Sequence, residues 1–276
     1  MKAMLRTIFN ETKRGERSDE RLEQAFTSIK RYLNVLQQSR HSSPSYSPKK
    51  LHRLYVWSQG FLDALDELEE SKYCAGRFAE RVKKSYLDEM QPEELDDYRR
   101  YVYFYKNALI RLFSVLDKLG YFLNDLFDLK TETLKTHFSF FTVLRKMRES
   151  GVHPALQQKL YELKTEAKQP LQVLRNQRNM EIHYVNVEML DDLMVSHSYL
   201  GDRIQVENIA DNLAQMDRGY EMVCITMDLV FQYISRGSIG ENGEENHGGG
   251  TQNGSHHGQR ERARQNGGAN AGQSRV

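Results

Sequence analysis

A regular pattern of apolar residues after Pro92 is the feature that most restricts what this chain can fold into. Apolar side chains recur there at alternating spacings of four and three residues for roughly four heptads. That spacing keeps one seam of a helix turned toward partner helices, and apolar neighbours widen the seam into a buried face. We therefore predict a long central helix. Its seam consists of Tyr98, Val102, Tyr105, Leu109, Leu112, Leu116, Leu119, Leu123 and Leu126.

Helical periodicity also marks the segments on both sides of this helix. Apart from residues 185–207, where a loop with short strands and a single helical turn both remain open, no segment shows the alternation of a strand. The sequence therefore predicts an all-α protein. Predicted helices cover residues 22–36, 48–68, 78–90, 134–149 and 209–234, and two more begin near Pro154 and Pro170.

Two residues are expected to mark helix ends. Gly151 follows the helix predicted over residues 134–149, and glycine adopts the left-handed conformation that ends many helices. Asn208 precedes the last predicted helix, where its side chain can accept a hydrogen bond from a free backbone N–H. Both predictions concern local backbone geometry.

Composition divides the chain into three parts. Residues 237–276 contain eleven of the 18 glycines and only two large aliphatic residues, Ile239 and Val276. A segment of this kind buries too little apolar surface to offset the entropy of ordering, so we expect a disordered tail. We expect residues 95–236 to form the main helical bundle and residues 1–94 to form a helical extension packed on it.

Charge and cysteine content restrict the function classes. The formal net charge is +1, so no global basic field exists and any contact with nucleic acid needs a local patch. Cys74 and Cys224 form neither a paired framework nor a metal-binding spacing, which favours a reducing compartment. The chain shows no secretory signal and no run of 18 apolar residues, so we expect a cytoplasmic protein that does not enter a membrane.

The helix that begins near Pro170 carries the chemically interesting residues. At about 100° per residue, Leu171, Leu174 and Ile182 share one core-facing stripe, and Arg178 falls inside it. An arginine on an apolar face is costly unless it is paired or directed into a cleft. A neutral polar row lies beside the stripe and could line a pocket. It consists of Gln172, Asn176, Asn179 and His183.

At these residues the sequence resembles the HEPN superfamily. The signature of that superfamily is an arginine followed after four to six residues by histidine, often with Asn, Asp or His directly after the arginine. Here it reads Arg178, Asn179 and, four residues after Asn179, His183. The heptad helix, the following segment and the long last helix also look like a stand-alone bacterial HEPN subgroup. The resemblance covers roughly residues 95–236 and implies an antiparallel HEPN-like bundle.

The resemblance implies a metal-independent endoribonuclease without cofactors, used as a toxin or phage-defence effector. His183 would act as general base or acid, since an ordinary imidazole pKa near ~6.5 suits either step. Arg178 would stabilise the negative charge on the phosphate, and Asn179 would orient either Arg178 or His183 through a hydrogen bond. Arg175, Asn176 and Tyr184 flank the motif and are expected to bind the RNA substrate. The products would be a 2′,3′-cyclic phosphate and a 5′-hydroxyl.

Helix geometry and the resemblance both bear on partners. On an ideal helix, Arg178 and His183 point about 140° apart, so either the reach of the arginine side chain or a second protomer must complete the site, and we expect a homodimer. The resemblance also implies an antitoxin or nucleotidyltransferase partner. In the members that such a transferase modifies, a tyrosine stands two residues after the histidine. This chain has Val185 there and Tyr184 one residue earlier.

Several alternatives remain open. Arg178 could instead pair with Glu181 or with a carboxylate on a neighbouring helix, and the chain would then be a non-catalytic module that binds nucleotide, RNA or protein. A second match to the spacing, Arg148 and His153, spans Gly151 and lies at a helix end. The tyrosines at 98, 101, 103 and 105 could pack in the core or stack on bases. The tail histidines have no helix-based ligand set, and no metal site is expected.

Overall fold

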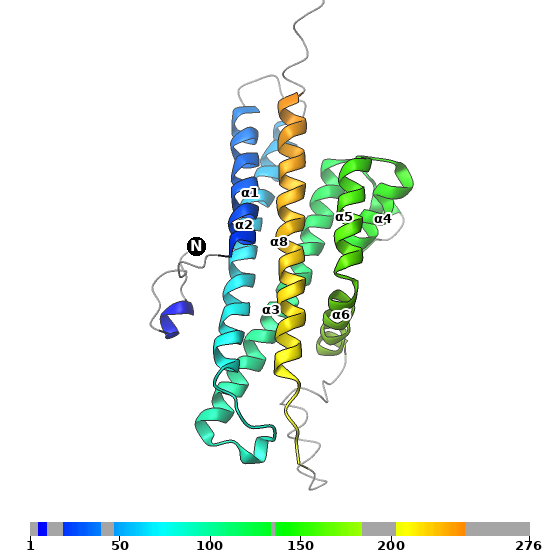
Figure 1. Ribbon diagram of the computed structural model, residues 1–276. Coiled ribbons are helices and arrows are strands. Elements are labelled where there is room, and N and C mark those ends of the chain that lie inside the picture. Colours follow the sequence, from blue (N-terminus) through cyan, green and yellow to red (C-terminus); the bar gives the residue numbers. More distant parts are fainter. Residues whose placement is uncertain (1–4, 10–18, 40–46, 134–135, 184–202, 241–276) are drawn as a thin grey trace, which may run out of the picture.

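The computed structural model describes residues 5–9, 19–39, 47–133, 136–183 and 203–240, without the side chains of residues 5, 182, 183 and 238–240. Long helices lie side by side, with the shorter ones on one flank of the bundle (Figure 1). No strand occurs in these ranges, which confirms the all-α class. The long helices are α1 (Glu20–Ser39), α2 (Pro48–Ala79), α3 (Pro92–Leu126) and α8 (Ile209–Gly240).

An aromatic cluster joins the four long helices at the centre of the bundle. Tyr32, Phe61, Phe122 and Phe231 come from α1, α2, α3 and α8, one from each helix. The Phe122 ring lies 5.6 Å from the Phe61 ring and 5.5 Å from the Phe231 ring, centroid to centroid. Aromatic pairs at these separations stabilise a core beyond simple area burial. The helices of the chain's first 79 residues therefore share one core with α3 and α8.

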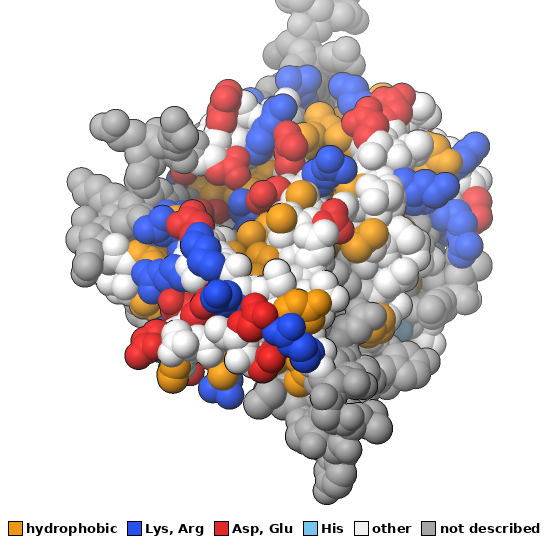
Figure 2. Space-filling view, turned by 60° about the horizontal axis from the view of Figure 1, so that its bottom comes forward, with side chains coloured by type: hydrophobic (Ala, Val, Ile, Leu, Met, Phe, Trp, Pro, Cys, Tyr) orange, Lys and Arg blue, Asp and Glu red, His pale blue; other side chains and the backbone are white. Residues whose placement is uncertain are grey.

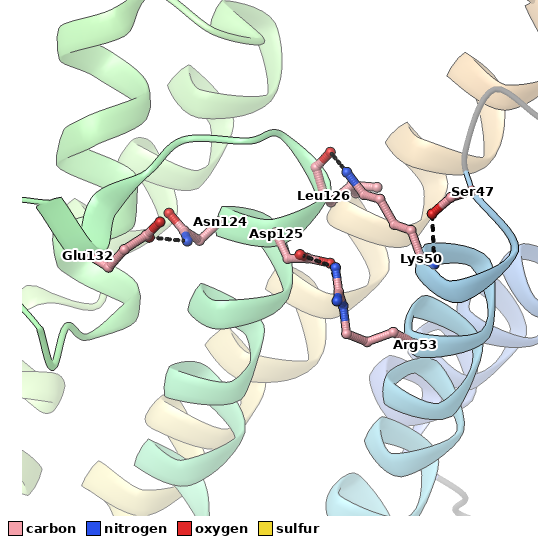
Figure 3. A network of polar contacts seen from close by, with 7 residues as sticks. All are labelled: Ser47, Lys50, Arg53, Asn124, Asp125, Leu126 and Glu132. Atoms are coloured by element: carbon pink, nitrogen blue, oxygen red, sulfur yellow. Dashed lines mark hydrogen bonds and ion pairs between the residues drawn. The ribbon is translucent and has the colours of Figure 1, made fainter.

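The predicted seam of α3 is confirmed. All nine residues of the seam are buried, and none exposes more than 7% of its surface. The helix begins at Pro92 and ends at Leu126. Figure 3 shows how polar contacts hold its C-terminal end against the start of α2: Lys50 donates to the Leu126 carbonyl and Arg53 pairs with Asp125. Cations next to free carbonyls stabilise a helix C-terminus.

Three shorter helices lie on the flank of α3 and α8: α4 (Phe140–Ser150), α5 (Pro154–Glu166) and α6 (Lys168–His183). Glycines allow two close approaches there. A Cβ on Gly120 of α3 would lie 2.8 Å from the Phe140 Cα, and one on Gly219 of α8 would lie 2.6 Å from Leu174 Cδ1 of α6. These contacts seat α4 against α3, and α6 between α3 and α8.

The predicted helix ends are confirmed. Gly151 follows α4 with φ +65°, and its N–H bonds back to the last turn. Asn208 accepts a hydrogen bond from the Asp211 N–H through Oδ1 at 3.1 Å. Two short 3-10 turns precede and follow α3, η2 (Leu87–Glu89) and η3 (Thr131–Thr133), and a third, η1 (Leu5–Phe9), contacts α2.

The helix predicted over residues 78–90 is wrong. Phe78 belongs to the last turn of α2, which ends at Ala79. Tyr86 then forms an isolated antiparallel bridge with Gln205, and the Leu87 N–H bonds to the Ile204 carbonyl at 3.0 Å. The extended segment at 203–207 supplies these bonds, so the spacing of apolar residues that favoured a helix is overruled by pairing with a distant part of the chain.

Two predicted boundaries also need correction. α4 begins at Phe140 rather than at residue 134, because Phe138 lies in the preceding coil and packs its ring 4.4 Å from that of Tyr121. α8 continues to Gly240, so residues 237–240 are helical and not part of a disordered tail. The expected disorder of residues 241–276 concerns a part of the chain outside the described residues, as does the open choice for residues 185–202.

The described helices also bear on membranes and on cysteine chemistry. None of them combines the length and the apolar character that crossing a bilayer requires. Cys74 and Cys224 are free and buried. Burial raises the pKa of both thiols to about 12. Because the thiolate is the reactive form, both cysteines are structural packing residues in this fold.

Candidate functional site

Helix α6 carries the motif residues and packs against α3 and α8. Leu171 and Leu174 are buried, as the predicted stripe requires, whereas the side chain of Ile182 lies outside the described residues. The close approach at Gly219 lets Leu174 pack against α8 while it also faces α3. The apolar half of α6 therefore fixes the helix against α3 and α8.

Arg178 lies against α3 and is half-buried. Its guanidinium carbon is 4.7 Å from the centroid of the Phe113 ring, a cation–π contact, and Nη2 donates to Asn179 Oδ1 at 2.9 Å. The Nε atom is buried and has no hydrogen-bond partner within the described ranges. Nor does Arg178 form an ion pair with any described carboxylate. The predicted alternative of an ion pair with a neighbouring helix is thus not what holds this arginine.

Asp117 of α3 is the carboxylate that the two motif-helix arginines influence. Burial raises the pKa of the Asp117 carboxyl, while the hydrogen bond from the Phe140 N–H and the charges of Arg178 and Arg175 lower it. Burial is the largest of these effects. Asp117 Oδ1 accepts the Phe140 N–H at 3.3 Å, which ties it to the start of α4. The Asp117 charge therefore acts on both arginines, but within the described ranges neither guanidinium forms a hydrogen bond with this carboxylate.

The other predicted substrate-binding residues separate into two groups. Arg175 is half-buried, and its guanidinium carbon lies 4.8 Å from the Phe141 ring centroid on α4. Asn176 is exposed and accepts a hydrogen bond from Gln172 at 3.0 Å, so two members of the predicted polar row are joined. Tyr184 and the side chain of His183 lie outside the described residues, although the α6 backbone includes His183.

Glu181 is held by a neighbouring helix. Its carboxylate pairs with Lys106 of α3, Oε2 to Nζ, at 3.1 Å, and both side chains are about four-fifths buried. This pair connects the C-terminal part of α6 to α3. Glu181, which lies between Arg178 and His183 in the sequence, therefore pairs with Lys106 and not with Arg178.

Sequence reasoning missed Gln177, which joins three helices. Gln177 Oε1 accepts the Tyr105 hydroxyl at 2.7 Å, and its Nε2 donates to Asn212 Oδ1 at 2.8 Å. These contacts link α6 to α3 and α8 one residue before Arg178. The sequence hardly indicates this role, because a glutamine next to an arginine is common in helices. Gln177 gains the role only because α3, α6 and α8 pack together at this point.

The second match to the motif spacing, Arg148 and His153, lies at a helix end. His153 precedes α5 with φ +50°, its Nδ1 lies 3.0 Å from the Tyr233 hydroxyl, and burial lowers its pKa. The Arg148 and His153 match is therefore a helix junction.

Tyr98, Tyr101 and Tyr105 are buried in the core, so the predicted alternative of a base-stacking platform fails for them, and Tyr103 alone of the four is exposed.

The visible surface carries no large area of one charge. In Figure 2, lysine and arginine side chains alternate with aspartate and glutamate over the face shown. This agrees with the near-zero net charge. Within the described ranges, no group of three or more His, Cys, Asp or Glu side chains is arranged to hold a metal ion.

Comparison with known proteins now identifies the family. The family model described as HEPN_Cthe2314-like HEPN matches residues 57–235, well over half of the chain. The chain belongs to this HEPN family. The match begins inside α2, earlier than the region from about residue 95 that carries the resemblance in the sequence. Neither a curated protein nor a solved structure gave a match to the chain.

Membership supports a general HEPN-type function, which is often ribonuclease activity or a role connected with nucleotides. The matched region includes α3, α6 and α8. It therefore contains Arg178, Asn179 and the backbone of His183. The HEPN signature and the geometry around Arg178 fall in the same part of the molecule.

Proposed function

We propose that this HEPN protein is a metal-independent endoribonuclease that acts as a homodimer. The observation that carries the proposal concerns Arg178. This half-buried arginine of the HEPN motif is positioned by Phe113 and Asn179, and it forms no contact ion pair with any described carboxylate. Holding a cation without neutralising it costs folding free energy. A phosphate group would supply negative charge and accept hydrogen bonds from the guanidinium.

The reaction follows from the chemistry of RNA. The 2′-oxygen of a ribose attacks the adjacent phosphorus, its proton passes to a base, and the bond from phosphorus to the 5′-oxygen of the next nucleotide breaks. The leaving oxygen takes a proton from an acid. The products are a 2′,3′-cyclic phosphate and a free 5′-hydroxyl, and no metal ion is needed because the protein supplies both the proton transfer and the charge stabilisation.

Each motif residue has one role in this proposal. His183 transfers the proton, as general base toward the 2′-hydroxyl or general acid toward the leaving oxygen. Arg178 contacts the non-bridging phosphate oxygens and stabilises the negative charge that develops on them. Asn179 is a positioning residue, because its Oδ1 already accepts a hydrogen bond from Arg178 Nη2. Arg175, Asn176 and Tyr184 bind the neighbouring nucleotides.

Cleavage of RNA in the presence of EDTA tests the proposal. We expect the purified wild-type chain to cleave single-stranded RNA at neutral pH and to leave 2′,3′-cyclic phosphate ends. His183→Ala and Arg178→Ala should each lower kcat by about 100-fold or more, since proton transfer and charge stabilisation each contribute on that order. His137→Ala is the matched control, because His137 is exposed and lies outside the motif.

Two results would refute the proposal. One is cleavage at the wild-type rate by the His183→Ala protein, which would point to a contaminating nuclease. The other is the absence of cleavage by wild type on a broad set of RNA substrates together with tight binding of RNA or nucleotide that does not depend on His183. That second result would assign the chain to the alternative function, a non-catalytic HEPN module that binds nucleotide, RNA or a protein partner.

The biological setting belongs to the same proposal. A ribonuclease of this kind would serve as a toxin or phage-defence effector and would require a neutralising antitoxin or a nucleotidyltransferase partner. Val185 stands where modified family members carry tyrosine, and Tyr184 lies one residue earlier, so this departure speaks against modification by a transferase. Mass spectrometry of the protein isolated with its partner would show whether Tyr184 carries a nucleotide.

A further inference from the structure

A pocket outside the motif lies between α4 and α5. It has a volume of about 390 Å³, within the range of small-ligand sites. Three cationic side chains and two aromatic rings account for most of its lining, and no carboxylate lines it. The lining residues are Phe141, Thr142, Leu144, Arg145, Arg148, Tyr161 and Lys164.

The aromatic rings of the pocket hold its cations in place. The Arg148 guanidinium carbon and the Lys164 Nζ each lie 5.3 Å from the centroid of the Tyr161 ring. A cation–π contact of this kind orders a flexible side chain without neutralising its charge. Arg148 and Lys164 have no carboxylate partner in the described chain, whereas Arg145 pairs with Glu149 at 3.6 Å. Two ordered, uncompensated positive charges therefore face the pocket.

Phe141 connects this pocket to the motif helix. Its ring lines the pocket, and it contacts cations from two helices: the Arg175 guanidinium carbon at 4.8 Å and the Lys164 Nζ at 6.0 Å from the ring centroid. Arg175 precedes Arg178 by one turn of α6. Positive charges therefore continue from the HEPN motif along Arg175 and Lys164 to Arg148.

We infer that this α4–α5 pocket binds the backbone phosphates of the RNA strand next to the cleaved bond. Arginine offers paired N–H donors to phosphate oxygens and lysine adds a point charge, while neither reads the base. The inference rests on the proposed function, since it extends the same substrate beyond the motif. It predicts that a strand of several nucleotides binds better than a mononucleotide, because only the strand reaches both sites.

Binding of a cleavage-resistant strand tests the inference separately from catalysis. The probe is a fluorescent 2′-O-methyl oligonucleotide of about 12 nucleotides, which has no attacking 2′-hydroxyl. Its affinity for the full-length chain is measured by anisotropy over a range of salt concentrations. Arg148→Gln with Lys164→Gln should weaken binding about tenfold and reduce the salt slope by about 1.4, or about 0.7 for each lost phosphate contact.

The matched control is Lys146→Gln with Lys159→Gln, which removes two positive charges from the same helices outside the pocket lining. Equal weakening in both double variants would overturn the inference, as would displacement of the probe by equimolar AMP, which would make the pocket a mononucleotide site. Loss of cleavage in His183→Ala with unchanged probe binding supports both proposals. Specific binding without any cleavage supports the pocket while refuting the ribonuclease.

Discussion

At the scale of single residues, the sequence predicts that Arg178 lies on an apolar helix face, but it does not predict which residues surround it. The stripe of Leu171 and Leu174 shows that an arginine falls on the apolar side of α6, and the structure confirms that both leucines are buried. The two residues that act on this arginine come from α3: Phe113 contacts it and Asp117 influences it by charge. They could not be predicted because contacts between distant segments depend on how whole helices pack, which local periodicity does not specify.

The carboxyl of Asp117 gives a pH-dependent prediction. Its pKa is raised in the folded protein, mainly by burial, so the folded state binds the proton more tightly than the unfolded state. Stability should therefore fall as the pH rises from the ordinary aspartate value near ~3.9 through the raised value, and remain lower above it. Asp117→Asn removes this loss and keeps an Oδ1 acceptor for the Phe140 N–H.

Thermal unfolding of wild type and Asp117→Asn, measured between about pH 3.5 and 7, tests this prediction, because carboxyl groups titrate in about that range. The Asp117→Asn protein should melt at a higher temperature than wild type at pH 7, and the difference should shrink toward zero at the acid end. A variant that melts below wild type at pH 7 would show that attraction to Arg175 and Arg178 outweighs the cost of burial.

At the scale of elements, prediction succeeds where one face of one helix decides the outcome. The heptad seam predicts α3 from its own residues alone, and Gly151 and Asn208 predict helix ends from local backbone chemistry. Prediction fails over residues 78–90 because the backbone bonds there go to residues 204–206, more than a hundred positions away. Apolar residues at a spacing of four do not reveal such a partner.

Close packing between α3 and α4 gives a prediction at this scale. Gly120→Ala would place a Cβ 2.8 Å from the Phe140 Cα, and backbone cannot move aside as a flexible side chain can. We expect a loss of about 1–3 kcal/mol in the free energy of unfolding. Gly60→Ala in α2 is the control, because nothing lies within 4 Å of its Cβ position. It should gain up to about 1 kcal/mol from helix propensity.

Urea unfolding of the two alanine variants checks this pair. Opposite signs of the change in unfolding free energy, with Gly120→Ala destabilised, agree with the close approach of α4 to α3. Stabilisation of both variants would mean that α4 is not seated against Gly120, and the position of Asp117 relative to the start of α4 would then need revision.

At the scale of the whole molecule, the bundle extends over most of the described chain. Tyr32 and Phe61 come from the first 94 residues and lie in the same aromatic cluster as Phe122 and Phe231. The family match includes the second half of α2. A division of the chain at residue 94 remains a prediction, and so does the role of the glycine-rich tail.

The dimer is the feature of the whole molecule on which the proposed chemistry depends. Arg178 and His183 lie on one continuous helix, five positions apart, and on an ideal helix with about 100° per residue two such positions are separated by about 140° around the axis. We propose that a second protomer, rather than the reach of the arginine side chain, brings both residues onto one phosphate. This requirement distinguishes the account from any in which each protomer acts alone.

A heterodimer of two inactive variants tests this central claim most directly. Arg178→Ala and His183→Ala chains, each with its own affinity tag, are co-expressed, purified through both tags and assayed for RNA cleavage in EDTA. Each homodimer should be inactive. The heterodimer keeps one complete site, Arg178 from one chain and His183 from the other, and should cleave at about half the wild-type rate per dimer. A heterodimer as inactive as its parents, beside an active wild type, would contradict the account.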